Sequence, residues 1–195
     1  MKMQKNRHCV IASVIGLALP FSQAYALQDG ADTLLERHAA LREELADNPF
    51  QRPLVIESSD QDGRLEGEIY AQLERPFVAV APRLKTTAQW CDVLILHLNV
   101  KSCRPASVDS VDTLKISIGR KFEQPLAEAY PFMFVYQVKA NRPDFLQVQL
   151  TAADGPMGTS NYGIERQLVA LDEQRSFMHL SYAYHYGLVS QAAMQ

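Results

Sequence analysis

The chain has 195 residues, of which 47% are hydrophobic and 21% are charged, and its formal net charge at neutral pH is −3. This acidic balance excludes a nucleic-acid binder, because no stretch supplies the basic footprint that phosphates require. Common enzyme signatures are also missing: there is no G-x-S-x-G elbow, no P-loop, no G-x-G-x-x-G and no H-E-x-x-H.

Residues 1–26 are predicted to be a cleaved secretory signal. The stretch "MKMQKNRH" is cationic, the apolar run "CVIASVIGLALPF" is short for a bilayer span, and "AYA" at 24–26 offers the small residues that a signal peptidase reads. An uncleaved N-terminal anchor is the alternative. Cleavage near Ala26 would leave a charge of −6 and 169 residues, which suit one domain. We therefore expect a periplasmic or secreted protein.

The segment 27–49 is predicted to hold an amphipathic helix at 31–46, which "NPF" ends. The stripe of this helix comprises Leu34, Leu35, His38, Leu41, Arg42 and Leu45. Two alternating runs follow within 53–74 and predict a hairpin, with "SSDQDG" as its turn. "DQDG" with Glu66 also has the spacing of the start of a calcium loop. The loop length and flanking helices of such a site are missing, so a hairpin turn is the better interpretation.

The stretch "RPFVAVAPRLKTTAQWCDVLILH" at 75–97 has helical apolar spacing, and Pro82 is expected to kink or restart the helix. A second short helix or turn would carry Trp90. An oxidising compartment favours a disulfide between Cys91 and Cys103, and two buried free thiols are the alternative. No metal site is expected, because neither cysteine belongs to a C-x-x-C pair and no histidine follows at ligand spacing.

From residue 98 onward the pattern is strand after strand, with short links that contain Gly, Pro, Asn or Asp. The predicted strands are 98–103, 113–119, 130–140, 145–152, 162–171 and 176–187. Together with the first hairpin they make an antiparallel meander of about eight strands with one helical interruption.

The last strand has one wide aromatic face, formed by Ser176, Met178, Leu180, Tyr182, Tyr184 and Tyr186. Its opposite face carries Phe177, His179, Ser181, Ala183 and His185 and is expected to be partly solvated. The two histidines would lie roughly 20 Å apart on a strand and could not share a metal. An aromatic face of this size must be covered, because such patches are rare on soluble monomers unless they bind something.

Two stretches resemble the START-like (SRPBCC, helix-grip) superfamily: "RPFVAVAPRLKTTAQWCDVL" and "GTSNYGIERQLVALDEQRSFMHLSYAYHYG". The resemblance implies an α+β domain over 50–195, with a curved antiparallel sheet of about seven or eight strands around a long C-terminal helix. Between sheet and helix it implies a cavity for lipids, sterols or other apolar ligands.

The sequence departs from the family at its end, because only "LVSQAAMQ" follows Gly187 and would make a stub of that helix. Either the chain is truncated, which is the favoured interpretation, or another chain, a membrane or a ligand takes the place of the helix.

Arg166 is the most informative candidate site residue, because the alternation of 162–170 turns it toward the core. It could anchor a carboxylate or phosphate head group. Alternatively it could pair with an acid on a neighbouring strand, or the opposite face could point inward. The other candidates for a ligand cavity are Trp90, Phe132, Phe134, Tyr136, Tyr182, Tyr184 and Tyr186.

These observations predict a periplasmic binding or carrier protein for an apolar small molecule or lipid, without a cofactor or metal and with transient membrane contact as an option. One alternative is a cyclase or dehydratase that acts on a ligand in the same cavity. That activity would need a titratable pair within hydrogen-bond reach, and arginine is a poor base. A membrane-complex adaptor is the other alternative.

Overall fold

A computed structural model describes residues 22–187, and the side chains of residues 30–187. Nearly all of the predicted signal peptide and the predicted C-terminal stub after Gly187 lie outside these residues. No helix in the described part of the chain is long and apolar enough to cross a membrane.

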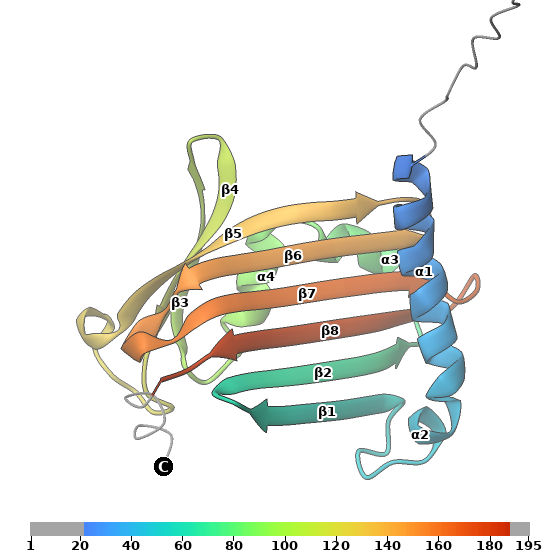
Figure 1. Cartoon of the computed structure of the whole chain (residues 1–195), viewed down its shortest axis with the longest axis horizontal. Coiled ribbons are helices and arrows are strands. Elements are labelled where there is room, and N and C mark those ends of the chain that lie inside the picture. Colours follow the sequence, from blue (N-terminus) through green and yellow to red (C-terminus); the bar gives the residue numbers. More distant parts are fainter. Residues whose placement is uncertain (1–21, 188–195) are drawn as a thin grey trace, which may run out of the picture.

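Eight antiparallel strands form one curved sheet in the order β1-β2-β8-β7-β6-β5-β4-β3 (Figure 1). The strands are β1 (Leu54–Gln61), β2 (Arg64–Leu73), β3 (Val100–Val108), β4 (Val111–Ile118), β5 (Tyr130–Asn141), β6 (Phe145–Asp154), β7 (Ser160–Ala170) and β8 (Ser176–His185). The predicted α+β class, the strand number and the antiparallel meander are confirmed. The last strand does not lie at an edge, because β8 pairs with β2 of the first hairpin as well as with β7.

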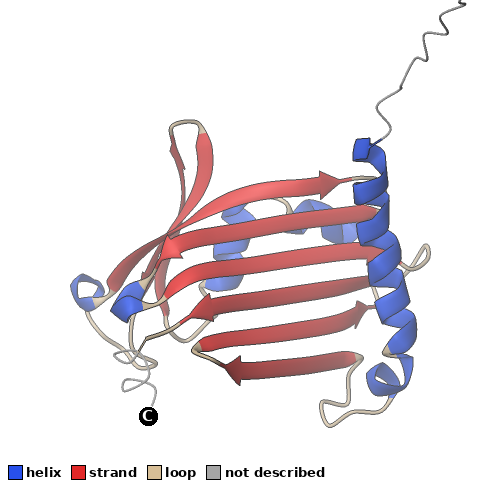
Figure 2. Ribbon diagram, in the orientation of Figure 1, coloured by secondary structure: helices blue, strands red, loops and turns tan. Residues whose placement is uncertain are grey.

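The helices lie on both sides of this sheet (Figure 2). They are α1 (Ser22–Ala40), α2 (Arg42–Ala46), α3 (Phe77–Val80) and α4 (Thr87–Leu94), with three short 3₁₀ turns η1 (Ala81–Leu84), η2 (Leu126–Glu128) and η3 (Pro156–Gly158). As expected, the helix is interrupted at Pro82, which lies in η1, and a second short helix carries Trp90. That helix, α4, begins at a capping box between Thr86 and Gln89, which satisfies the free N–H groups of its first turn.

The turn of the first hairpin is shorter than predicted. β1 extends to Gln61, so only Asp62 and Gly63 connect the strands, with φ values of 52° and 72°. Two left-handed residues in a two-residue loop match the right-handed twist of a hairpin, and glycine adopts this conformation at little cost. "SSDQDG" is therefore mostly strand, and the hairpin interpretation of "DQDG" is confirmed over a calcium loop.

One side of the sheet, called here the α1 face, is covered by α1 and α2, and α1 runs across the strands near one end (Figure 1). Leu34, Leu41 and Leu45 are buried there against Phe145 and Phe177. The predicted stripe was wrong at two positions, since Leu35 and Arg42 are exposed. The buried positions Ala31, Leu34, Leu41 and Leu45 form a narrower stripe that faces the sheet, and Leu35 and Arg42 lie outside it.

The opposite side, called here the α4 face, carries α3, η1 and α4 over only part of the sheet (Figure 1). α4 packs on β3 and β4, and α3 packs on β7. The buried side chains of this layer include Phe77, Trp90, Leu114, Phe134, Tyr136, Val148, Leu150 and Leu168. No helix of residues 22–187 lies behind β1 and β2 in Figure 1, and Ile56 of β1 is 49% exposed on this part of the face, called here the open half.

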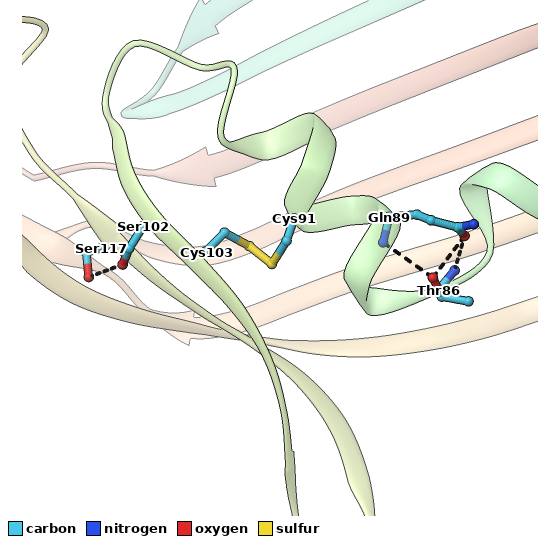
Figure 3. The surroundings of a disulfide bond; sticks show 6 residues. All are labelled: Thr86, Gln89, Cys91, Ser102, Cys103 and Ser117. Atoms are coloured by element: carbon cyan, nitrogen blue, oxygen red, sulfur yellow. Dashed lines mark hydrogen bonds between the residues drawn. A yellow bond between two sulfur atoms is a disulfide. The ribbon is translucent and has the colours of Figure 1, made fainter.

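The predicted disulfide is present. Cys91 of α4 is bonded to Cys103 of β3, with their Cα atoms 5.2 Å apart (Figure 3). The bond ties the helical insertion to the strand at one edge of the sheet. It therefore also fixes the position of Trp90, which precedes Cys91 on α4.

Candidate functional site: a buried arginine beside an open apolar face

Arg166 lies on the α4 face of β7 and is only 5% exposed. Its guanidinium carbon is 3.9 Å from the ring centroid of Trp90, which α4 supplies. One amino group, Nη2, donates a hydrogen bond to the carbonyl oxygen of Leu84 at the end of η1. Strand β7 and the helical insertion, distant in sequence, therefore meet at this side chain.

The charge of Arg166 has no carboxylate partner among residues 30–187, where every ion pair involves other residues. The proposed salt bridge to a neighbouring-strand acid is thus absent from this part of the chain. Burial lowers the pKa of Arg166 to about 10, which still leaves the group protonated at neutral pH. A buried, unpaired cation is costly to desolvate, so a fold keeps one where something else offsets that cost.

Two N–H donors at this position lack an acceptor. The Nε atom of Arg166 and the indole Nε1 of Trp90 are both buried with no hydrogen-bond partner in the described structure. Buried polar groups in native proteins are nearly always satisfied by protein, water or ligand. The protein itself therefore leaves both of these N–H donors unsatisfied in the described structure.

Tyr136 belongs to the same cluster. Its hydroxyl donates to the carbonyl oxygen of Lys85, the residue after Leu84. Burial raises the pKa of Tyr136, and the positive charge of Arg166 acts in the opposite direction. Both side chains thus clamp the end of η1, and together with Trp90 they form one polar centre in an apolar layer.

An aromatic group adjoins this centre toward the other end of the strands. The ring of Tyr162 stacks on Tyr184 with centroids 4.9 Å apart, and it also contacts Phe132 and Phe134. Phe132 and Phe134 are buried, whereas the two tyrosines are half-buried. Tyr162 was not among the predicted site residues, although the alternation of 162–170 already placed it on the same face as Arg166.

Tyr182 and Tyr186 occupy different positions from this stack. The ring of Tyr182 lies across Gly67 of β2, where a Cβ atom would come within 2.2 Å of the tyrosine ring. Tyr186 follows the end of β8, and its hydroxyl donates to the carboxylate of Asp60 on β1. The structure therefore brings Trp90, Tyr136 and Arg166 together, and it separately brings Phe132, Phe134 and Tyr184 together. Tyr186 lies just beyond the end of β8, beside the turn between β1 and β2.

The open half of the α4 face continues directly from Arg166. The cross-strand neighbour of Arg166 on β8 is Leu180, which pairs in turn with Ile69 of β2, and Ile69 pairs with Ile56 of β1. Leu180 and Ile69 are half-buried, and Ile56 is 49% exposed. On the other flank, Val148 of β6 is fully buried. Side chains along this row thus change from buried at Arg166, through half-buried at Leu180 and Ile69, to exposed at Ile56.

The site is an open face, whereas the resemblance implied an enclosed cavity. Two hollows occur elsewhere on the surface. One, of about 250 Å³, lies mostly on the α1 face and is lined by residues that include Glu66, Glu68 and Glu165. The other, of about 460 Å³, lies beside β3, β4 and β5 and includes Arg104 and Lys115. Neither is lined by Arg166.

His179 lies on the α1 face, as the alternation predicts. Its ring stacks on Tyr70 with centroids 4.5 Å apart, and its Nε2 atom is hydrogen-bonded to the Glu68 carboxylate. No group of histidine, cysteine or acidic side chains suited to a metal occurs in the described residues. His179 thus has structural partners of its own and takes no part in the Arg166 cluster.

No family model and no curated protein matches the sequence. The fold resembles solved structures at low identity. An aromatase/cyclase from a Streptomyces species has a TM-score of 0.46 at 10% identity, over 66% of this chain and 73% of that chain. A point mutant of norcoclaurine synthase from Thalictrum flavum has a TM-score of 0.45 at 12% identity, over 69% and 79%. A START superfamily protein from Mycobacterium smegmatis has a TM-score of 0.43 at 9% identity, over 69% and 78%.

These similarities are partial and concern the fold alone. The fold and the site define an α+β protein in which helices cover half of one sheet face. Its distinguishing feature is the buried cation at the border between the covered half and the open half.

Proposed function

We propose that this protein binds or carries a hydrophobic ligand, which lies on the open half of the α4 face. The observation that carries the proposal is the row from Arg166 through Leu180 and Ile69 to Ile56, in which half-buried and exposed apolar side chains follow a buried polar centre. Ligand sites are typically apolar surfaces with a few placed polar groups, and this row has that composition.

Binding is favoured over catalysis by the groups near Arg166. General acid–base chemistry needs a titratable pair within hydrogen-bond reach of the reacting atoms. The groups that meet in the Arg166 cluster are an arginine, a tryptophan and a tyrosine whose hydroxyl already bonds to Lys85. Burial raises the pKa of that tyrosine, so it stays protonated and does not serve as a base near neutral pH.

The proposed location is the periplasm or the exterior of the cell. The cationic and apolar N-terminal pattern with "AYA" at 24–26 supports this location. The disulfide between Cys91 and Cys103 supports it independently, because disulfides persist in oxidising compartments.

Transient contact with an anionic membrane is proposed for the surface formed by Leu96, Leu98 and Phe122, called here the apolar tip. These side chains are 79%, 68% and 63% exposed. The Lys101 ammonium donates to the carbonyl oxygens of Leu98 and Phe122 and so joins the two loops, and Arg120 lies over the Phe122 ring. Apolar side chains among cations fit the interface of an anionic bilayer.

Native mass spectrometry with lipid extraction, applied to protein purified from its own host, tests the proposed function directly. A co-purifying apolar molecule is expected. Binding can also be followed with N-phenyl-1-naphthylamine, a neutral apolar dye. Leu180→Gln should weaken dye binding, whereas Ser181→Gln, on the opposite face of the same strand, should not. An empty protein that binds no apolar compound would refute the proposal.

A further inference from the structure

We propose that the ligand of this face carries a carboxylate head group, which Arg166 binds while the apolar body lies over Leu180 and Ile69. This inference rests on the proposed function, because it names the chemistry of the ligand for the same site. The Arg166 cluster leaves two buried N–H donors without acceptors in the described structure.

The cluster is rich in donors and poor in acceptors. Arginine has five N–H donors, and among the described residues only Leu84 accepts one from Arg166. The indole N–H of Trp90, against which the guanidinium is stacked, also lacks an acceptor. The two nearby carbonyl oxygens, of Leu84 and Lys85, are already engaged by Arg166 and Tyr136. A ligand group that only accepts hydrogen bonds complements this arrangement.

The electrostatics favour a single negative charge. Arg166 is the one cation of the cluster, and Arg83 and Lys85 have exposed side chains. A carboxylate carries one charge and matches the planar guanidinium, forming charge-assisted hydrogen bonds that are about twice as strong as neutral ones. A phosphate monoester carries about −1.5 to −2 at neutral pH and would leave excess charge buried here. The site therefore fits a carboxylate better than a phosphate.

The surroundings set the direction of the apolar body. Trp90 covers one side of the guanidinium, and Val148 on β6 is fully buried, so both of these sides are closed. Leu180 on β8 is half-buried and leads to the open half of the face. A long apolar chain attached to the carboxylate would therefore extend across β8 and β2 toward β1.

The chain contains one tryptophan, so Trp90 fluorescence reports on this site alone. The experiment titrates the full chain with palmitic acid, methyl palmitate and hexadecyl phosphate near pH 8, and measures affinity both from Trp90 emission and from displacement of the neutral dye. The acid should bind at least about tenfold more tightly than the ester, because it gains a charged hydrogen bond. Arg166→Gln should remove that preference by lowering the affinity for the acid far more than the affinity for the ester, and Arg166→Lys should retain part of the preference. Arg104→Gln, an exposed arginine on β3, should behave as wild type.

The outcomes separate this inference from the proposed function. Equal binding of acid and ester by the wild type would overturn the carboxylate assignment while leaving a hydrophobic binder, and tighter binding of the phosphate would reassign the head group. A uniform loss of affinity in Arg166→Gln would show that the arginine only holds the fold together. If Arg166→Gln fails to fold, the wild-type ratio and Arg166→Lys still decide. Failure of every apolar compound to bind would instead refute the proposed function.

Discussion

Trp90 and Arg166 stack with 3.9 Å between the guanidinium carbon and the ring centroid, and Arg166 forms no ion pair with a carboxylate in the described structure. One residue comes from the helical insertion and the other from the centre of the sheet. Their contact places a charge in the core at the border of the open apolar half. This arrangement is more easily explained by ligand recognition than by stability, because a buried ion pair or an apolar side chain would stabilise the same position better.

Arg166→Met therefore should not destabilise the ligand-free protein strongly. The methionine loses the hydrogen bond to Leu84 but removes a desolvated charge, so the free energy of unfolding should stay unchanged or rise by up to about 2 kcal/mol. Urea denaturation followed by circular dichroism measures the change. A loss larger than about 2 kcal/mol would mean that Arg166 mainly pins η1 to the sheet.

Ionisation of buried and half-buried tyrosines should lower the stability of the fold at alkaline pH. Burial raises the pKa values of Tyr136, Tyr162 and Tyr184 above the ordinary value of 10. A raised pKa in the folded state gives stability that is present below pH 10 and is lost as the pH rises through the folded pKa. Arg166 acts in the opposite sense, because its folded pKa of about 10 is below its ordinary value of 12.5. The tyrosines therefore lower the stability as the pH rises, and Arg166 raises it over the same range.

Denaturation midpoints measured between about pH 9 and about pH 11 test this expectation. Tyr162→Phe should reduce the steepness of the fall. Tyr130→Phe is the matched control, because Tyr130 is 51% exposed. An equal effect of the two variants on the pH dependence would contradict the assignment.

The mature protein should begin at Leu27 and carry the disulfide between Cys91 and Cys103. Intact mass before and after reduction and alkylation decides both points.

Reduction of this disulfide should lower the free energy of unfolding by about 3 kcal/mol on the chain-entropy model. It should also change Trp90 emission, since Trp90 adjoins Cys91 on α4. Two thiols that alkylate without reductant would exclude the disulfide.

Leu41→Ala should destabilise the protein by about 2–5 kcal/mol, because it leaves a cavity between the helical segment and the α1 face of the sheet. Leu41 is only 2% exposed and belongs to the cluster that contains Phe145 and Phe177. Leu35→Ala is the matched control, since Leu35 is 38% exposed. Chemical denaturation of both variants checks the difference, and similar losses would argue that α1 packs otherwise.

The double variant Leu96→Ser with Leu98→Ser should bind anionic vesicles at least about tenfold more weakly than the wild type, because two large apolar side chains no longer enter the interface. Co-sedimentation with phosphatidylglycerol vesicles measures the binding. Val78→Ser removes a side chain that is 72% exposed on α3 and should have no effect. Equal binding of all three proteins would remove the membrane proposal for the apolar tip.

The sequence alone predicted most of the secondary structure, because the relevant signals are local. Period-two alternation identified the strands, and helical apolar spacing with proline marked the helical insertion. The same alternation placed Arg166 and the tyrosines of the last strand on one face. It also separated His179 from that face, which the structure bears out.

The tertiary structure decided which of these residues meet. No local signal specifies that β8 joins the first hairpin through β2, or that η1 and α4 fold back to bring Leu84 and Trp90 to Arg166. Such contacts depend on which distant surfaces bury the most apolar area together when the whole sheet forms. The exposure of each side chain on the α4 face depends likewise on what covers it. The pattern of one strand predicts an apolar face, and only packing determines which half of that face stays open.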